Sequence, residues 1–348
     1  MNKFIAMFAA AAAMSVAFGR IALADEKPTN YTLTNTVALG APERWDYVVY
    51  DSLSGRVYVA HGPKVSVIDG RTVTIVGTIG DFPGGSHGIG ISPATGTGYT
   101  DDGKAGVAVP FDLVSLKTAA PIPTASDADG VVFDPASNHI LVINGDSGSV
   151  TVIDPATNKA ITTINAGGGL EFGLVDGRGK FFVDGAEKGE IVRIDTAANA
   201  VDAHWPMAGC VKPHGIAMDM STRRIFATCT NQVMVVIDAD KGTNIATLPI
   251  GSYTDFAAFD PVRKLAFSSN GDGTLSVIKE KDANTFVVLP SIKTALSART
   301  MAIDPKSGRL FLAAADVAKI DPPATPGGRP HVQFVPGSLK LLVFDPSP

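Results

Sequence analysis

The chain has 348 residues, of which 45% are hydrophobic and 18% charged, a balance that excludes a disordered protein. Its 36 Gly and 23 Pro favour a fold with frequent turns over one built from long helices. The formal net charge of −5 provides no basic face, so nucleic acid is disfavoured as a partner.

The N-terminus has the three parts of an export signal. Lys3 supplies a positive charge, residues 4–18 form an apolar stretch, and Ala22-Leu23-Ala24 is a small-x-small cleavage site. The apolar stretch is shorter than the roughly 20 residues that a bilayer requires, and Arg20 follows it. We therefore predict a signal peptide at residues 1–24 and a periplasmic or secreted product that has no membrane span after cleavage.

The rest of the chain repeats itself with a period of about 42 residues, which indicates a repeat architecture. An apolar strand recurs seven times, and its copies end at Asp69, Asp112, Asp154, Asp195, Asp238, Lys279 and Asp345. Each unit holds three clear strands and a weaker fourth, which is the content of a propeller blade. We predict an all-β, seven-bladed β-propeller that forms a single domain over residues 25–348.

The two ends of the repeat region carry the irregular features. The last blade lacks an outer strand, and we predict that residues 31–39 pair in it and close the ring. The last two repeats end 66 residues apart, so blade 7 carries an insertion over about residues 314–337. Its Pro-rich part either forms a semi-rigid lid, with Arg329 and His331 as contact residues, or is a tolerated surface insertion.

Short segments within the repeats resemble a known family. The segments Tyr58-Val-Ala, Leu141-Val-Ile-Asn144 and Phe267-Ser-Ser-Asn270, each followed by Gly and a strand of the Val-Ile-Asp type, are similar to the YVTN-type repeats of YncE-like periplasmic β-propeller proteins. The resemblance implies the propeller fold and a periplasmic binding or scaffold role. It does not name a ligand, because function lies in sites that differ among proteins of one fold.

Aligning the blades places one polar residue at the start of each innermost strand, where it faces the central channel. The spacings are 41, 42, 42, 43, 41 and 44, and the seven residues are Asp46, His87, Asp129, Glu171, His214, Asp255 and Arg299. We call this set the mouth ring and predict that it binds a ligand. The alternative is a structural ring in which Arg299 bridges Asp46 and Asp255.

The chemistry of the mouth ring leaves several ligands open. Mixed imidazole and carboxylate groups suit a divalent metal such as zinc, manganese, iron or calcium, with His87, Asp129, Glu171, His214 and Asp255 as the candidate ligands. The same groups suit an organic cation, or act as acid and base. Four carboxylates face one Arg, so without a cation some of them should have raised pKa values.

A second, wider set lies at the ends of the second strands: His61, Asp101, Asn144, Asp184, Cys229 and Asn270. For Asn144 and Asn270 we favour turn formation, because Gly-Asp follows each, and a surface turn explains His61. The chain has two cysteines, Cys210 and Cys229, both in blade 5. In an exported protein a disulfide between them is the first expectation, and a thiolate metal site is the alternative.

The sequence thus predicts an exported β-propeller that acts as a binding or scaffold protein, with a small molecule or a metal ion at the channel mouth. One alternative is a metal-dependent hydrolase or lactonase at the same channel site, in which a metal polarises the substrate carbonyl. Another is a platform for protein partners whose mouth ring is purely structural.

Overall fold

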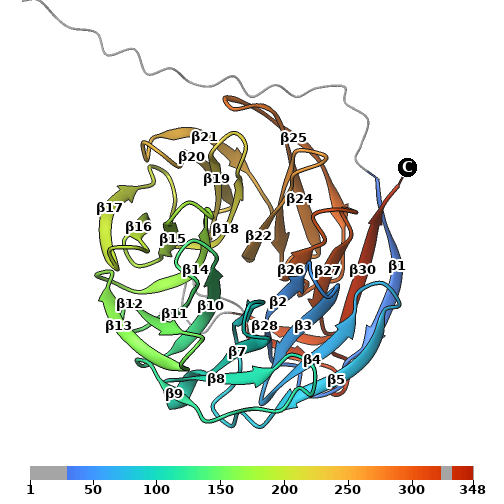
Figure 1. Cartoon of the computed structure of the whole chain (residues 1–348). Coiled ribbons are helices and arrows are strands. Elements are labelled where there is room, and N and C mark those ends of the chain that lie inside the picture. Colours follow the sequence, from blue (N-terminus) through green and yellow to red (C-terminus); the bar gives the residue numbers. More distant parts are fainter. Residues whose placement is uncertain (1–29, 323–330, 348) are drawn as a thin grey trace, which may run out of the picture.

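The protein is described by a computed structural model that covers residues 30–322 and 331–347. Its strands form seven four-stranded antiparallel sheets that radiate around a common axis (Figure 1). The predicted seven-bladed β-propeller is confirmed. The predicted signal peptide, residues 1–24, lies outside the described residues. Among the described residues the helical structure is one short turn, η1 (Gly103–Ala105), and no helix is long and apolar enough to span a membrane.

Blades 1 to 3 follow each other in chain order, and each runs from the axis outward. Blade 1 contains β2 (Trp45–Asp51), β3 (Arg56–His61), β4 (Lys64–Asp69) and β5 (Thr74–Gly80). Blade 2 contains β6 (Ile89–Ser92), β7 (Thr97–Asp102), β8 (Val107–Asp112) and β9 (Ile122–Pro123). Blade 3 contains β10 (Ala128–Asp134), β11 (His139–Asn144), β12 (Ser149–Asp154) and β13 (Lys159–Asn165).

Blades 4 to 6 repeat the same order. Blade 4 contains β14 (Leu170–Val175), β15 (Lys180–Gly185), β16 (Glu190–Asp195) and β17 (Ala200–Pro206). Blade 5 contains β18 (Pro213–Asp219), β19 (Arg224–Cys229), β20 (Val233–Asp238) and β21 (Asn244–Pro249). Blade 6 contains β22 (Thr254–Asp260), β23 (Leu265–Asn270), β24 (Thr274–Asp282) and β25 (Thr285–Lys293).

Blade 7 joins the two ends of the described chain. It contains β26 (Thr300–Ile303), β27 (Leu310–Ala314), β30 (Lys340–Pro346) and, as its outer strand, β1 (Tyr31–Ala38). Strand β1 runs antiparallel to β30, from the pair Tyr31 and Pro346 to the pair Ala38 and Lys340. The predicted closure by residues 31–39 is therefore confirmed.

Aspartates also recur where the innermost strands end, and there they have a local structural role. Asp134 ends an innermost strand, and its carboxylate accepts hydrogen bonds from the backbone N–H groups of Ala136 (3.1 Å) and Ser137 (3.0 Å). This contact fixes the tight turn into the next strand. The same contact recurs after Asp51, Asp219, Asp260 and Asp304.

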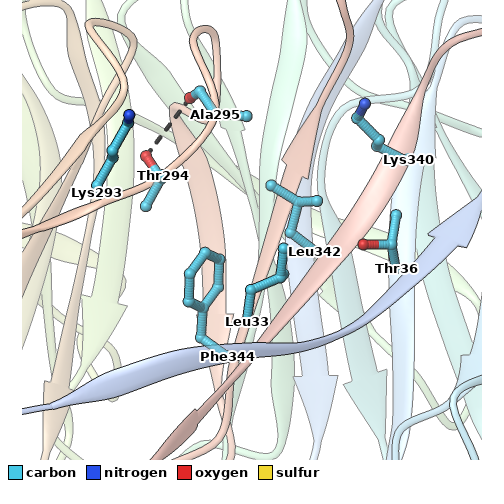
Figure 2. A pocket seen from close by; sticks show the side chains of 8 residues that line it. All are labelled: Leu33, Thr36, Lys293, Thr294, Ala295, Lys340, Leu342 and Phe344. Carbon is cyan, nitrogen blue, oxygen red and sulfur yellow. Dashed lines mark hydrogen bonds between the residues drawn. The ribbon is translucent and has the colours of Figure 1, made fainter.

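A surface groove lies beside the closing strands, between blade 7 and the end of blade 6 (Figure 2). Its volume is about 410 Å³. Apolar side chains of Leu33, Leu342 and Phe344 lie in its lower part in the figure, and Lys293 and Lys340 lie at its upper end. None of the mouth-ring residues lines this groove.

The insertion of blade 7 forms a hairpin of β28 (Val317–Asp321) and β29 (His331–Phe334). Phe334 packs against Trp45 of β2, with the ring centroids 5.1 Å apart. The hairpin is thereby anchored at the mouth of the channel. His331 is exposed beside Asp321, and Arg329 lies outside the described residues, so the lid function stays a prediction.

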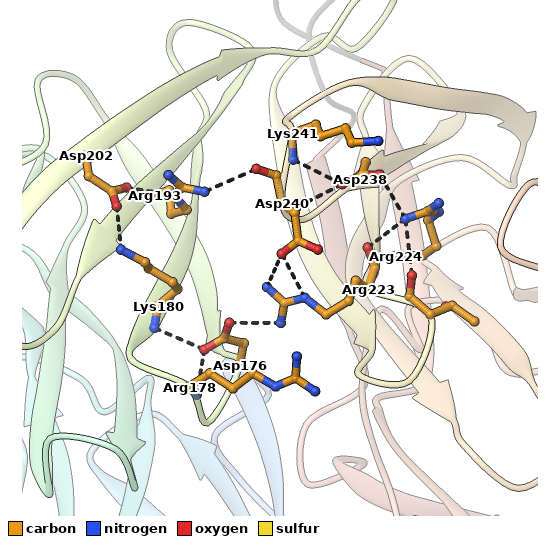
Figure 3. Close-up of polar contacts among 11 residues, drawn as sticks. Asp176, Arg178, Lys180, Arg193, Asp202, Arg223, Arg224, Asp238, Asp240 and Lys241 are labelled. Atoms are coloured by element: carbon orange, nitrogen blue, oxygen red, sulfur yellow. Dashed lines mark hydrogen bonds and ion pairs between the residues drawn. The ribbon is translucent and has the colours of Figure 1, made fainter.

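Ion pairs join blades 4 and 5 at the ends of their innermost strands that lie away from the mouth ring (Figure 3). Arg223 of blade 5 contacts Asp176 of blade 4 at 2.9 Å and Asp240 at 2.8 Å. Asp176 is buried, so its charge has to be paired. Arg223 therefore links two neighbouring sheets across their seam.

Candidate functional site at the channel mouth

Irregular strand pairing directs the mouth-ring side chains. In blades 1, 3, 4, 5 and 6 the pairing of the first two strands shifts register next to the ring residue, as between Ala128 and Val131 around Asp129. Such bulges turn a side chain away from the regular alternation. All seven ring residues are partly exposed, and six of them lie between two buried neighbours. This common pattern agrees with the prediction that they surround one accessible opening.

His214 occupies the centre of a chain of contacts across blades 4 to 7. Its Nδ1 lies 3.2 Å from Glu171 Oε2 and 3.9 Å from Asp255 Oδ1. The other oxygen of Asp255 accepts a 2.6 Å hydrogen bond from Arg299 Nε. Four residues that lie far apart in the sequence are thus brought together, as the alignment of the blades predicts.

Arg299 connects this chain to blade 1. One of its terminal nitrogens donates to the carbonyl of Trp45 at 3.1 Å, and its guanidinium lies 5.0 Å from the centroid of the Trp45 ring. The expected bridge from Asp255 to Asp46 is therefore seen in part: Arg299 hydrogen-bonds to Asp255 and to the backbone of Trp45, and Asp46 is affected by its charge. The Trp45 ring contacts both Arg299 and Phe334, so it links the insertion hairpin to the mouth ring.

His87 pairs with an acid of its own blade. Its Nδ1 lies 2.7 Å from Asp101 Oδ2, and its backbone N–H donates to Asp101 Oδ1 at 2.9 Å. Burial alone would lower the pKa of His87, but the hydrogen bond and charge of Asp101 raise it to about 9. Asp101, which the sequence placed in the wider set, is thus a direct partner of a ring residue.

The remaining acids of the ring, Asp46 and Asp129, have too little positive charge beside them to favour their ionised forms. Burial raises the pKa of Asp46 to about 7, with Asp255 adding to the effect against His87 and Arg299. Burial and the charge of Asp46 raise the pKa of Asp129 well above its usual range. These directions agree with the excess of carboxylates over cations in the ring, and they leave the site ready to accept a positive charge.

Three aromatic rings fill the channel beside these acids. Tyr47, Phe172 and Phe256 come from blades 1, 4 and 6, and their centroids lie 4.8 to 6.0 Å apart. Tyr47 Oη donates to Asp129 Oδ2 at 3.4 Å. Since blades 1 and 4 are not neighbours, Tyr47 and Phe172 can be in contact only if both side chains extend into the channel. We call these three residues the aromatic floor.

The sequence contained a signal for the aromatic floor that the analysis of charged positions missed. The residue that follows each ring residue is aromatic in three blades and Gly in three others, and the seven are Tyr47, Gly88, Gly130, Phe172, Gly215, Phe256 and Thr300. A Cβ atom on Gly215 would lie 2.5 Å from the backbone of Phe256 in the next blade. The small residues thus permit close packing of the innermost strands, and the aromatic residues fill the space that remains.

The wider set of second-strand residues does not form one ring. His61, Asn144, Cys229 and Asn270 pair with the first residue of the innermost strand, whereas Asp101 and Asp184 lie one residue earlier in their strands. Successive strand residues point to opposite faces, so the two groups diverge. The surface turn expected for His61 is wrong, because His61 is buried and its Nε2 lies 2.8 Å from Ser66 Oγ. Burial lowers its pKa to about 4.

Cys210 and Cys229 form a disulfide, with their Cα atoms 5.4 Å apart. The bond ties the loop before β18 to the end of β19 and lies four residues before His214 in the chain. No free cysteine remains among the described residues, so the thiolate metal site is wrong.

The candidate metal set is only partly assembled. Glu171, His214 and Asp255 are in contact, whereas His87 pairs with Asp101. Within residues 30–322 and 331–347, no group of three or more His, Cys, Asp or Glu side chains is arranged to hold a metal ion. A metal at the mouth ring stays a prediction.

Comparison with known proteins agrees with the repeat pattern. No family model matches the chain. The chain is 26% identical over 188 residues to the uncharacterized protein YncE of Salmonella typhimurium and 25% identical over the same length to that of Salmonella typhi. Each match covers 52% of this chain and 52% of the relative. The chain is thus a β-propeller protein that is similar in sequence to YncE over about half of its length. Because the matched region spans about half the length of these relatives, the likeness carries no activity or partner.

A solved structure supports the same fold. A chain of the hydrazine synthase of Kuenenia stuttgartiensis superimposes with a TM-score of 0.67, over 78% of the chain described here and 92% of its own length. The sequence identity is 12%, so the likeness concerns the fold alone.

Proposed function

We propose that this YncE-like protein is an exported binding protein that holds a small organic cation at the mouth of its channel. One observation carries the proposal: four carboxyl groups of the mouth ring, from blades 1, 3, 4 and 6, lie beside the aromatic floor. Carboxylates supply charge for a cation, and aromatic faces attract one through their quadrupole.

The local electrostatics favour a cation over an anion. Asp46 and Asp129 have raised pKa values, because burial and neighbouring acids disfavour their ionised forms. A positive ligand would replace the missing counter-charge and release protons from these groups. Arg299 does not fill this role for all of them, because its guanidinium already contacts Asp255 and the carbonyl of Trp45.

Calorimetric titration with tetramethylammonium and spermidine tests the proposal. The Asp129→Asn variant removes a ring carboxyl group that would ionise when a cation binds, and Asp146→Asn removes an exposed charge from the same blade. We expect Asp129→Asn to weaken binding about tenfold, equivalent to about 1.4 kcal/mol, and Asp146→Asn to leave it unchanged. Equal affinities in both variants, or no binding by the unmodified protein, would reject an organic cation at the mouth.

Elemental analysis separates this reading from a metal at the same ring. The purified mature protein is compared with the His214→Ala and Glu171→Ala variants. If the unmodified protein contains one equivalent of metal and both variants lose it, the ligand at the mouth is a metal ion and the organic cation is rejected. Assays with lactones and esters would then test the hydrolase alternative, for which His87 held by Asp101 is a suitable acid or base.

Export is tested separately, on the full-length precursor. The positive start, the short apolar stretch and the disulfide in blade 5 support it. We expect the mature protein in the periplasmic fraction or the medium, and we expect its intact mass to match a chain that starts at Asp25. A cytoplasmic product that retains Lys3 would contradict export.

A further inference from the structure

Blade 4 contains a buried acid that no contact explains. Asp184 of β15 is completely buried, and neither of its carboxylate oxygens has a hydrogen-bond partner among the described residues. Burial raises its pKa well above the usual range, and the charge of Glu171 adds to the effect. Burying an unpaired carboxylate is strongly unfavourable, so Asp184 has to be neutralised, either by a proton or by a bound cation.

The internal symmetry of the propeller shows what is missing. Asp101 of blade 2 occupies the position of Asp184, and His87 occupies that of Glu171. In blade 2 the acid accepts the backbone N–H groups of His87 (2.9 Å) and Gly88 (2.8 Å) and pairs with the imidazole (2.7 Å). Blade 4 thus replaces an imidazole and carboxylate pair by two carboxyl groups.

Other blades satisfy the same position internally. In blade 5 it is Thr228, whose hydroxyl accepts from the N–H of Gly215 at 3.1 Å. In blade 6 it is Ser269, whose hydroxyl donates to the carbonyl of Arg299 at 2.5 Å. Among the polar residues at this position in the described blades, Asp184 is the one without such a partner.

We propose that Asp184 and Glu171 form an inner site for a hard divalent cation, Mg²⁺ or Ca²⁺. Both side chains offer oxygen ligands, which these ions prefer, and Mg²⁺ is commonly held by one or two carboxylates together with water. The Glu171 side chain is 31% exposed, so this side of the proposed site is open to solvent. The site shares Glu171 with the mouth ring but does not depend on an organic ligand there.

The test measures how the ions stabilise the protein. Protein freed of metal with a chelator is titrated with MgCl₂ and CaCl₂ while thermal unfolding is followed by calorimetry. We expect one of the ions to raise the Tm of the unmodified protein by at least about 2 °C at saturation. The Asp184→Asn variant should bind it at least about tenfold more weakly. Glu190→Gln, which removes a buried carboxylate elsewhere in blade 4, should retain the full shift.

Three results would overturn the inner site. The first is no shift for the unmodified protein with either ion, and the second is an equal shift in Asp184→Asn, which would mean that Asp184 only carries a proton. The third is a shift that His214→Ala abolishes and Asp184→Asn retains, which would move the ion to the mouth ring. If Asp184→Asn does not fold, Glu171→Gln at the partly exposed position replaces it. Titration of the Asp184→Asn variant with tetramethylammonium tests separately whether the mouth ring still binds an organic cation.

Discussion

Replacing both Cys210 and Cys229 by alanine removes the covalent link between the loop before β18 and the end of β19. The two residues are 19 apart in sequence. In the chain-entropy account, closing a loop of this size stabilises the folded state by about 3 kcal/mol. The buried Cys229 also packs in the core of blade 5, so its lost sulfur adds roughly 1 kcal/mol.

A loss of about 3 to 4 kcal/mol is large against the roughly 5 to 15 kcal/mol that stabilises a typical domain. Urea unfolding measures it, with far-UV circular dichroism for the strands and fluorescence of Trp45 and Trp205 for two blades. A reducing agent should destabilise the unmodified protein by about 3 kcal/mol and leave the double variant unchanged. A difference below about 1 kcal/mol between the oxidised and reduced protein would refute loop closure as the source of stability.

The remaining predictions concern a buried acid, ring closure and blade packing. Burial raises the pKa of Glu280 from 4.5 to about 7, so the native state binds a proton that the unfolded chain releases, and stability falls as pH rises through that window. Glu280→Gln should therefore be more stable relative to the unmodified protein at pH 8 than at pH 4, as measured by urea unfolding, and an equal difference at both would contradict the shift. Deleting residues 31–38 should abolish cooperative unfolding, and a synthetic peptide of that sequence should restore it by pairing with β30; a cooperative deletion variant would show that closure is dispensable. Gly215→Ala should cost about 1 to 3 kcal/mol, because its Cβ would meet the backbone of Phe256, whereas Gly169→Ala, with no contact below 3.8 Å, should cost less than 1 kcal/mol; similar losses would refute the packing role.

Residue spacing was sufficient to predict that Glu171, His214 and Asp255 lie close together, because a repeat of about 42 residues returns the chain to the same height on each blade. The contacts among Glu171, His214 and Asp255 follow from that regularity. The pairing of His87 with Asp101 could not be predicted from spacing. It depends on which face of β7 Asp101 occupies, and a register shift of one residue turns a side chain to the opposite face.

The aromatic floor was harder to predict for a different reason. Tyr47 and Phe172 belong to blades that are not neighbours, so no local pattern relates them. Their contact depends on the channel diameter, which follows from how closely glycines such as Gly215 let the innermost strands approach. The bridge from Arg223 to Asp176 likewise joins side chains 47 residues apart across a seam.

The pairing of β1 with β30 also governs the order of folding events. Blades 1 to 6 are each built from one continuous stretch of chain, so each can assemble from local contacts soon after synthesis. Blade 7 must wait until residues 340–346 have been made, although its outer strand is among the first parts of the described chain to appear. Until then the toroid is an open arc with an unpaired strand edge at each end, and such edges can pair with other chains.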